Sequence, residues 1–270
     1  LQVFPPKKYV EKMIAHRKDR KWAFDFMREH DTSPTDLVTR RYPRVAIIKP
    51  YDSCPQICVY CQRNWEIHQA MSPGALAGTT EIEAAVEWIR AHPAVREVLV
   101  TGGDPLILED RVLSGILERI AAIEHVDLIR IGSRIPVTLP MRITAELAAL
   151  LGSFRAPGRR EVALVTHVEH ALEITTSLVL AIDRLRRAGI GVYNQHVYTA
   201  YVSRRFETLH LRLMLRRAGI DPYYTFIPKG KRETDLYRVP LARILQEQRE
   251  EARLAPGLRP VSADPVQMHQ

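Results

Sequence analysis

Short apolar runs alternate with longer amphipathic segments along most of the chain. Runs of strand length lie at residues 45–48, 98–100, 128–131, 162–165, 190–197 and 221–227. Segments with helical periodicity follow them, at about 80–91, 109–122, 144–151, 174–188, 207–218 and 240–254. This order contains six strand–helix units, which predicts an α/β fold with a parallel sheet.

Two kinds of local signal mark the expected helix ends. Thr80 with Glu83 three residues later predicts a capping box at the start of the first helix. Gly189 and Gly219 follow later helices directly, where a glycine commonly ends a helix. These signals support the helix positions read from the periodicity.

Glycine and polar residues gather just after the carboxyl ends of the expected strands, where parallel α/β barrels carry their active sites. The strands are apolar almost throughout, which predicts that both faces of the sheet are covered. We therefore expect a partial (β/α)6 TIM-like barrel at 41–255, with a doubly wound sheet as the alternative. An N-terminal helical extension is expected at 1–40. A C-terminal tail is expected at 256–270, and whether the sequence is cut within it is left open.

The composition is that of an ordinary soluble globular protein. The 270 residues are 46% hydrophobic and 26% charged, with a formal net charge of +8. No apolar run approaches the length of a membrane span, so we expect no membrane partner. The excess arginines are spread along the expected helices, which favours a solvated face over a nucleic-acid partner.

All three cysteines, Cys54, Cys58 and Cys61, stand in one loop with the spacing C-x3-C-x2-C. Closely spaced cysteines typically hold an iron–sulfur cluster, and three ligands would leave one iron of a four-iron cube open to a small molecule. A zinc site with His68 as fourth ligand is an alternative. A disulfide would leave one cysteine over, and the start of the chain does not read as a signal peptide.

The cysteine spacing, with the aromatic Tyr60 before the last cysteine, resembles the radical S-adenosylmethionine (SAM) superfamily. Further motifs make the chain similar to the lysine 2,3-aminomutase family from about residue 40 to 245. These motifs are Arg41-Tyr42-Pro43, Thr101-Gly102-Gly103-Asp104-Pro105-Leu106, Ile131-Gly132-Ser133-Arg134-Ile135-Pro136, Thr166-His167, Asn194-Gln195 and Pro222-Tyr223-Tyr224. The resemblance implies a [4Fe–4S] cluster and reductive cleavage of SAM to a 5′-deoxyadenosyl radical that abstracts hydrogen.

The resemblance also implies cofactor contacts. Tyr60 would lie beside the SAM adenine, and Gly102, Gly103 and Asp104 would meet its methionine amino group. Taken alone, the glycine pair followed by Asp104 and Pro105 is a tight turn.

Three further residues, Ser133, His167 and Gln195, would contact SAM or a second cofactor. Each of them, without the family, is a polar residue satisfied at a strand end. Arg134 could equally be a structural arginine that pairs with a neighbouring strand.

Two residues bear on the substrate. Arg63 matches the arginine that holds the substrate carboxylate in the aminomutases, where a guanidinium fork fixes which C–H faces the radical. Without the family, it is equally well a solvated loop arginine. Lys229 stands nearest the place where lysine-acting enzymes carry an aspartate, so lysine itself is disfavoured as substrate.

The second cofactor of the family is pyridoxal phosphate, which aminomutases hold on a lysine after a Gly-rich stretch. No such stretch and no lysine follow the last expected helix, and Lys229 and Lys231 are the only lysines beyond Lys49. This favours a branch without pyridoxal phosphate. A chain cut before that lysine is the alternative, because Arg41 and Arg44 match the region near the cofactor phosphate.

We therefore expect an aminomutase-like isomerase that acts on a small substrate with a carboxylate or amino group. Alternatives are an enzyme of the same scaffold without pyridoxal phosphate and one that modifies RNA or a protein side chain. The expected partner is an electron donor such as flavodoxin or ferredoxin, and a homo-oligomer is left open. An oxidation-sensitive cluster indicates a reducing cytoplasm.

Overall fold

The computed structural model describes residues 7, 11, 29–58, 60, 61, 63, 67, 69–228 and 237–255. In these ranges seven strands form one sheet in the order β1 to β7, with β1 and β7 as its edges. The strands are β1 Val38–Tyr42, β2 Val45–Tyr51, β3 Glu97–Gly102, β4 Leu128–Gly132, β5 Glu161–Thr166, β6 Gly191–Val197 and β7 Asp221–Phe226. All neighbouring pairs are parallel except β1 and β2.

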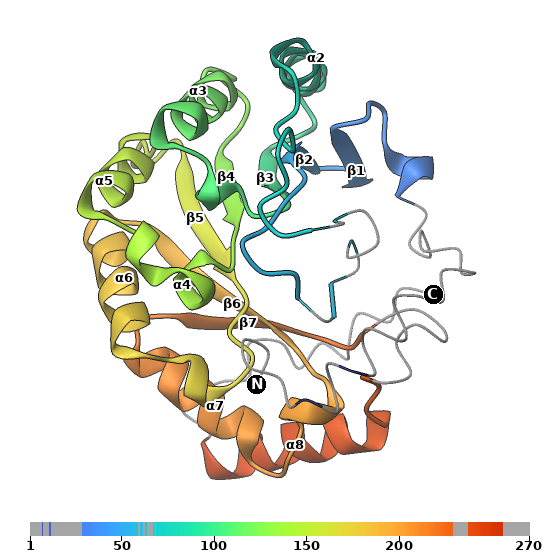
Figure 1. Cartoon of the computed structure of the whole chain (residues 1–270), viewed down its shortest axis with the longest axis vertical. Helices are drawn as coiled ribbons and strands as arrows, with labels where there is room; N and C mark the ends of the chain where they lie inside the picture. Colours follow the sequence, from blue (N-terminus) through green and yellow to red (C-terminus); the bar gives the residue numbers. More distant parts are fainter. Residues whose placement is uncertain are drawn as a thin grey trace.

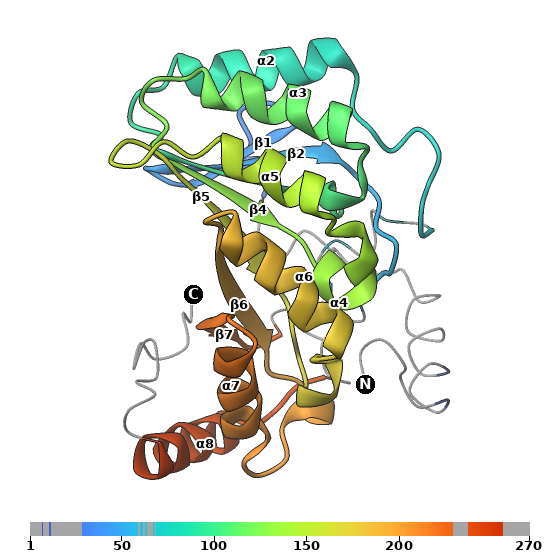
Figure 2. The same cartoon turned by 90° about the vertical axis from the view of Figure 1, so that its left-hand side faces the viewer.

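The helices lie on the outer side of the curved sheet, except the short helix directly after β4, which lies at the carboxyl ends of the strands (Figures 1 and 2). They are α2 Thr79–Arg90, α3 Asp110–Ala121, α4 Ile135–Thr138, α5 Ala145–Ser153, α6 Thr176–Arg187, α7 Glu207–Arg217 and α8 Leu241–Leu254. Each parallel strand from β2 to β7 is followed by at least one of them, so the expected six-unit partial barrel is confirmed. The doubly wound sheet is wrong, because the strand order follows the chain without a reversal.

Strand β1 was not expected. Its sequence, Val38-Thr39-Arg40-Arg41-Tyr42, lacks an apolar run, and it joins the sheet through pairing with β2 and burial of Val38 and Thr39. The expected boundary between 40 and 41 falls inside this strand. Of the expected N-terminal helical extension, only residues 7, 11 and 29–40 are described, and from His30 onward they form a short 3-10 helix and then β1.

The hydrophobic core lies between the sheet and the surrounding helices. Along β3 and β4, alternate residues such as Val98, Val100, Ile129 and Ile131 are almost fully buried. Burying a side chain of this size contributes about 1.5–3 kcal/mol. The intervening residues face the inside of the barrel and are partly exposed. The expectation that both faces of the sheet are covered is therefore wrong for the inner face.

The helix ends follow the local sequence with one correction. Helix α2 starts after Gly78, whose amide donates to the Glu81 carboxylate at 2.8 Å, so the capping box predicted for Thr80 is wrong by two residues. Gly189 and Gly219 end α6 and α7 with φ of 80° and 78°, as expected. Among the helices in the described ranges, none has the length and apolarity needed to cross a lipid bilayer.

Candidate active site

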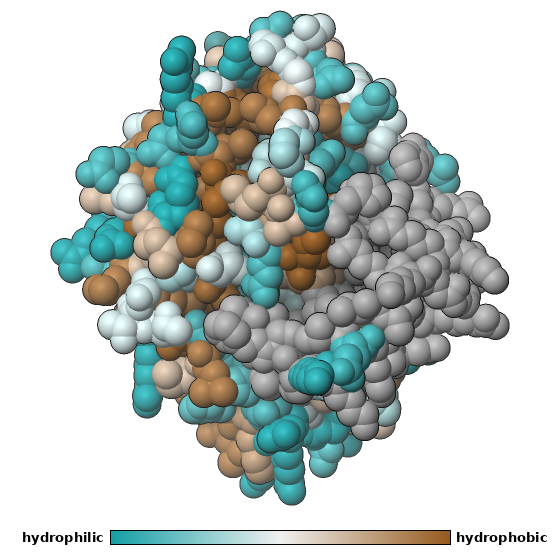
Figure 3. Space-filling model, in the orientation of Figure 1, coloured by the Kyte–Doolittle hydropathy of each residue, from teal (hydrophilic) through white to brown (hydrophobic). Residues whose placement is uncertain are grey.

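A cavity of about 420 Å³ opens at the carboxyl ends of the parallel strands, beneath the cysteine loop. Hydrophobic surface shows between polar side chains near the centre of this face (Figure 3). Eleven of the twelve residues proposed from the sequence line the cavity: Cys54, Cys58, Tyr60, Cys61, Arg63, Gly102, Gly103, Asp104, Ser133, His167 and Gln195. The twelfth, Lys229, lies outside the described residues.

The cysteine loop is held where it leaves and rejoins the barrel. The amide of Asp52 donates to the carbonyl of Ala75 at 2.9 Å, and the amide of Met71 donates to the carbonyl of Cys54 at 3.0 Å. The buried Ser53 hydroxyl accepts from the Ser72 amide at 2.8 Å. These bonds fix the backbone on both sides of Cys54.

The Gly102-Gly103 pair brings the end of β3 against the chain just before Cys54. Gly102 has a φ of 115°, which favours glycine. A Cβ atom on Gly103 would lie 1.9 Å from the carbonyl oxygen of Ser53. The amides of Gly103 and Asp104 donate to the carbonyls of Tyr51 and Ser53, at 2.5 and 2.8 Å. The two glycines therefore allow a close backbone contact that positions the first cysteine.

The Asp104 carboxylate joins the ends of β3 and β4. One oxygen accepts from the Leu106 amide at 3.2 Å and the other from the Arg134 amide at 2.7 Å. Burial raises the pKa of Asp104 to about 6, although bonds from Ser133 and the nearby amides lower it. Its expected role toward the methionine amino group stays a prediction, and the bonds seen here are within the protein.

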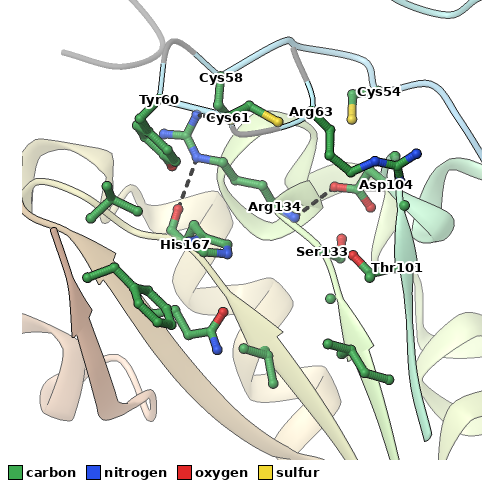
Figure 4. Close-up of a pocket in the computed structure, with 18 of the residues that line it drawn as sticks. Cys54, Cys58, Tyr60, Cys61, Arg63, Thr101, Asp104, Ser133, Arg134 and His167 are labelled. Atoms are coloured by element: carbon green, nitrogen blue, oxygen red, sulfur yellow. Dashed lines mark hydrogen bonds between the residues drawn. The ribbon is translucent and has the colours of Figure 1, made fainter. Parts of the chain in front are cut away.

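The side chain of Arg134 links the cysteine loop to the loop after β5 (Figure 4). Its Nη1 lies 3.4 Å from Cys58 Sγ, its Nη2 lies 2.9 Å from Glu173 Oε1, and its Nε donates to the His167 carbonyl at 3.0 Å. The whole residue is 6% exposed. Arg134 is thus structural, as one reading of the sequence had it, but it also contacts a proposed cluster ligand.

Two buried glutamates hold the loop after β5. Glu173 Oε2 accepts from the amide of Glu169 at 2.8 Å, and Glu169 Oε2 accepts from the amide of Val197 at 2.7 Å. The Glu169 carboxylate also lies 3.7 Å from Nδ1 of His167 and 3.8 Å from Nε2 of His196. Burial raises the pKa of Glu169, but the nearby His167, His196 and Arg134 side chains outweigh it and lower that pKa.

The strand alternation separates the two residues of the Asn194-Gln195 pair. Gln195 lines the cavity. Asn194 is buried on the other side, where its amide group accepts from the amide of Val168 at 2.6 Å and donates to the carbonyl of Val168 at 3.0 Å. Adjacent residues of one motif therefore have different tasks, because successive side chains of a strand point to opposite faces.

Aromatic groups flank the cavity near the second and third cysteines. The rings of Tyr60 and His167 lie 6.3 Å apart, centroid to centroid. Burial raises the pKa of Tyr60 well above its usual value, so the phenol is neutral. The two rings are tilted by 41° to each other, so a purine could stack on one of them and meet the edge of the other.

Arg63 lines the cavity beside Asp104 (Figure 4), and residues at the end of β7 line it as well. Arg63 Nη2 lies 3.0 Å from Oδ1 of Asp52, whose side chain is 53% exposed. Phe226, Ile227 and Pro228 contribute apolar side chains to the lining at the end of β7. The unexpected strand β1 contributes too, since Arg41 and Tyr42 also line this cavity.

The three cysteines are placed to serve together as ligands of an iron–sulfur cluster. None of them forms a disulfide, and all three line one cavity. Burial raises the pKa of Cys54, with further increases from the charges of Asp104, Cys61 and Cys58. Within the described ranges no three His, Cys, Asp or Glu side chains are close enough to hold one metal ion, and His68 of the zinc alternative lies outside them. A cube of irons holds its thiolates farther apart than one ion does.

Residues 48–245 match the profile of the Radical SAM superfamily. The chain belongs to the radical SAM superfamily. Membership implies a [4Fe–4S] cluster and SAM, and the three thiols on one cavity suit the cluster. The resemblance inferred from the cysteine loop is confirmed at this level.

Curated relatives of this radical SAM chain include members of the lysine 2,3-aminomutase group. This chain is 56% identical over 256 residues to an uncharacterized KamA family protein of Methanocaldococcus jannaschii, and the match covers 95% of this chain and 40% of the relative. It is 35% identical to the glutamate 2,3-aminomutase of Clostridioides difficile, covering 80% and 50%. With the L-lysine 2,3-aminomutase of Methanococcus maripaludis the identity is 36%, covering 75% and 45%. The chain thus spans about half the length of these relatives or less.

Solved radical SAM structures share the fold at low sequence identity. The AdoMet- and peptide-bound structure of anSMEcpe superposes with a TM-score of 0.57 at 11% identity, covering 78% of this chain and 60% of that one. SuiB of Streptococcus suis gives a TM-score of 0.55 at 13% identity, covering 90% and 49%. These likenesses support the partial barrel and carry no information on the substrate.

Sequence reasoning missed Glu169 and Glu173 and left Arg134 undecided. The glutamates follow Thr166-His167 in a loop without any motif, and only the fold brings them under the cysteine loop. The position of Arg134 directly after Ser133 at a strand end was the one available signal, because such positions point toward the cavity.

Proposed function

We propose that this radical SAM protein abstracts hydrogen from a small carboxylate-bearing amino acid in an aminomutase-like reaction. Cys54, Cys58 and Cys61 would hold a [4Fe–4S] cluster, and SAM would occupy the cavity beneath them. One observation carries the proposal: three free thiols and the other described residues of the family's site line a single cavity of about 420 Å³. When bound, the cluster and SAM supply a 5′-deoxyadenosyl radical.

The protein's own residues would bind and orient the cofactor. Tyr60 and His167 would flank the adenine, while Ser133 and Gln195 offer polar groups at the ends of β4 and β6. The backbone near Gly103 has no side chain in the way of a close approach. Because these groups come from rigid strand ends, they need little rearrangement to receive SAM.

Arg63 would hold the substrate carboxylate. In this structure its guanidinium bonds to the exposed carboxylate of Asp52, while Arg63 itself lines the cavity. Asp52 thus shows that a carboxylate can reach this guanidinium, and a substrate carboxylate could exchange with it. Such exchange is open to Asp52, because its side chain is 53% exposed and regains water when it leaves, whereas Arg63, at 18% exposed, stays in place.

Lysine is the disfavoured substrate in this proposal. Phe226, Ile227 and Pro228 line the cavity where a distal ammonium would need a carboxylate, and the sequence continues with Lys229. We propose that Lys229 repels an ammonium and attracts an acid. A Lys229→Asp variant should then shift preference from glutamate toward lysine, and an unchanged preference would remove Lys229 from the proposal.

Pyridoxal phosphate stays open in this proposal. The sequence has no lysine after Lys231, but the chain spans only 40–50% of the length of the relatives cited above, so that absence decides nothing. Purified protein incubated with pyridoxal phosphate would show an imine absorbance band if a lysine of this chain binds it. Turnover without that band would favour a reaction that does not use this cofactor.

The decisive experiment is anaerobic reconstitution with iron and sulfide, followed by dithionite, SAM and a panel of amino acids, with and without pyridoxal phosphate. Dithionite replaces the flavodoxin or ferredoxin that we propose as natural donor. We expect 5′-deoxyadenosine, and faster rearrangement of glutamate than of lysine. Protein that takes up neither iron nor sulfide, or that holds both and leaves SAM intact, would overturn the proposal.

A Cys58→Ala variant is the control for this assay. It should lose the cluster and all SAM cleavage, because two thiolates cannot replace three. Zinc without sulfide in the wild-type protein would instead support a structural metal site.

A further inference from the structure

Arg134 is held from three sides beneath the cysteine loop. Its three guanidinium nitrogens bond to three different acceptors: a thiol sulfur of Cys58, a carboxylate oxygen of Glu173 and the carbonyl of His167. Its own backbone amide donates to Asp104. Figure 4 shows the side chain directed from the end of β4 toward the loop that carries Cys58 and Cys61.

Burying the charged groups of Arg134 and Glu173 costs hydration free energy unless each group has a partner. The side chains of Arg134 and Glu173 are 7% and 3% exposed. A buried guanidinium is retained only where opposite charges and acceptors compensate for its lost hydration. Glu173 compensates on one side, and Glu169 in turn donates its amide to the second oxygen of Glu173 at 2.8 Å. The arginine is therefore fixed in direction, and one of its N–H groups is left for Cys58.

A fixed cation beside a cysteine ligand changes the energy of an iron–sulfur cluster. The reduced cluster carries one more negative charge than the oxidised one, and part of that charge resides on the thiolate sulfurs. Hydrogen bonds to these sulfurs and nearby positive charge stabilise the reduced form and raise the reduction potential. Glu173 acts in the opposite direction, but it bonds a different nitrogen of the fork, whereas Nη1 contacts the sulfur directly.

We propose that Arg134 is a positioning residue that holds the sulfur of Cys58 and raises the reduction potential of the bound cluster, and that Glu173 fixes its orientation. The inference rests on the proposed cluster at the three cysteines. The redox step is a one-electron reduction by an external donor, with no bond made or broken in the protein. The role goes beyond SAM binding, since it acts on a cysteine ligand before SAM is present.

The test is a dithionite redox titration of reconstituted protein without SAM, followed by electron paramagnetic resonance. Arg134→Gln should lower the ratio of reduced to oxidised cluster about tenfold at a fixed potential, equal to about 59 mV for one electron. Glu173→Gln removes a negative charge and keeps one acceptor oxygen for Arg134 at the expense of the bond from the Glu169 amide, so its ratio should rise.

Arg142→Gln is the matched control. Arg142 is a half-buried arginine that bonds to Asp110 and to the carbonyl of Leu108 and does not line the cavity. We expect it to leave the potential unchanged while it lowers stability.

The outcomes separate this inference from the proposed function. A normal iron and sulfide content with an unchanged potential in Arg134→Gln would overturn the inference and leave the proposed cluster intact. If Arg134→Gln assembles no cluster, Glu173→Gln decides, and an unchanged potential in that variant overturns the inference. Wild-type protein without iron and sulfide would refute the proposed function itself.

Discussion

Two groups of residues that line the cavity are built differently. The first group, which we call the inner wall, is Gly103, Asp104, Ser133 and Arg134 at the ends of β3 and β4, and it is buried and bonded across strands. The second group, which we call the outer wall, is Arg63, paired with the partly exposed Asp52, together with the apolar residues Phe226–Pro228. One wall is therefore preorganised, while the other offers a charge that can change partners.

This difference suits two kinds of ligand. A cofactor that is the same in every reaction benefits from fixed dipoles that need no rearrangement. A substrate must be released and selected, which an exchangeable pair and an apolar surface allow. If the comparison is right, changes on the inner wall should impair stability and cluster assembly, and changes on the outer wall should affect turnover.

The largest effect is expected from Gly103→Ala on the inner wall. The added Cβ would overlap the backbone of Ser53, which no rotamer can relieve. We expect a loss of about 3 kcal/mol in the free energy of unfolding, measured by urea denaturation, and a low iron content after reconstitution.

Gly158→Ala is the control for Gly103→Ala. Gly158 has a φ of 77° and open space where a Cβ would lie. The alanine substitution should therefore lower the free energy of unfolding by only about 1 kcal/mol, through backbone strain. Equal losses in the two variants would contradict the close contact between β3 and the cysteine loop.

Asp104→Asn should change how stability depends on pH. The pKa of Asp104 in the folded protein, about 6, lies above its ordinary value of 3.8. Between these values the folded state binds more protons than the unfolded state, so the stability contributed by this group falls as pH rises from about 4 to about 6. The total change is about 3 kcal/mol.

The measurement is urea unfolding of cluster-free wild-type and Asp104→Asn protein across this pH range. Other titrating groups act on both proteins, so the difference between their two curves isolates Asp104. Parallel curves would show that burial does not perturb this carboxyl.

On the outer wall, Arg63→Ala should lower kcat/KM for a carboxylate substrate by about 10–100-fold. This corresponds to the loss of one charge-assisted contact of about 1.5–3 kcal/mol. Cleavage of SAM to 5′-deoxyadenosine should continue without product. Arg63→Lys should recover only part of the activity, because an ammonium cannot form the two-point fork. If Arg63→Ala still forms one product for each SAM cleaved, Arg63 does not hold the substrate.

The smallest effect is expected from Asp52→Asn. It removes the carboxylate that competes for Arg63, so the KM for a carboxylate substrate should fall at most about fivefold. The iron content should stay normal. A higher KM would mean that Asp52 orients Arg63 and does not compete with the substrate.

Residues with a fixed position along the strands could be predicted from the sequence. The apolar runs end where glycine and polar residues begin, so Ser133, His167 and Gln195 could be assigned to one edge of the sheet. The cysteine spacing is local and needed no fold. By contrast, Val38–Tyr42 contains β-favouring residues but no apolar run, and its place in the sheet depends on pairing with β2.

The sequence by itself determined the order of the six strand–helix units, the cysteine loop and the side of the sheet on which the polar residues lie. Periodicity and spacing are local properties, and parallel strands place their carboxyl ends together. Only the tertiary structure decided which polar groups contact one another. Arg134 meets Cys58 across 76 positions of sequence and Glu173 across 39, and Asp104 meets the Arg134 amide across 30. Such contacts form because buried charges and amides require partners wherever the folded backbone brings them together.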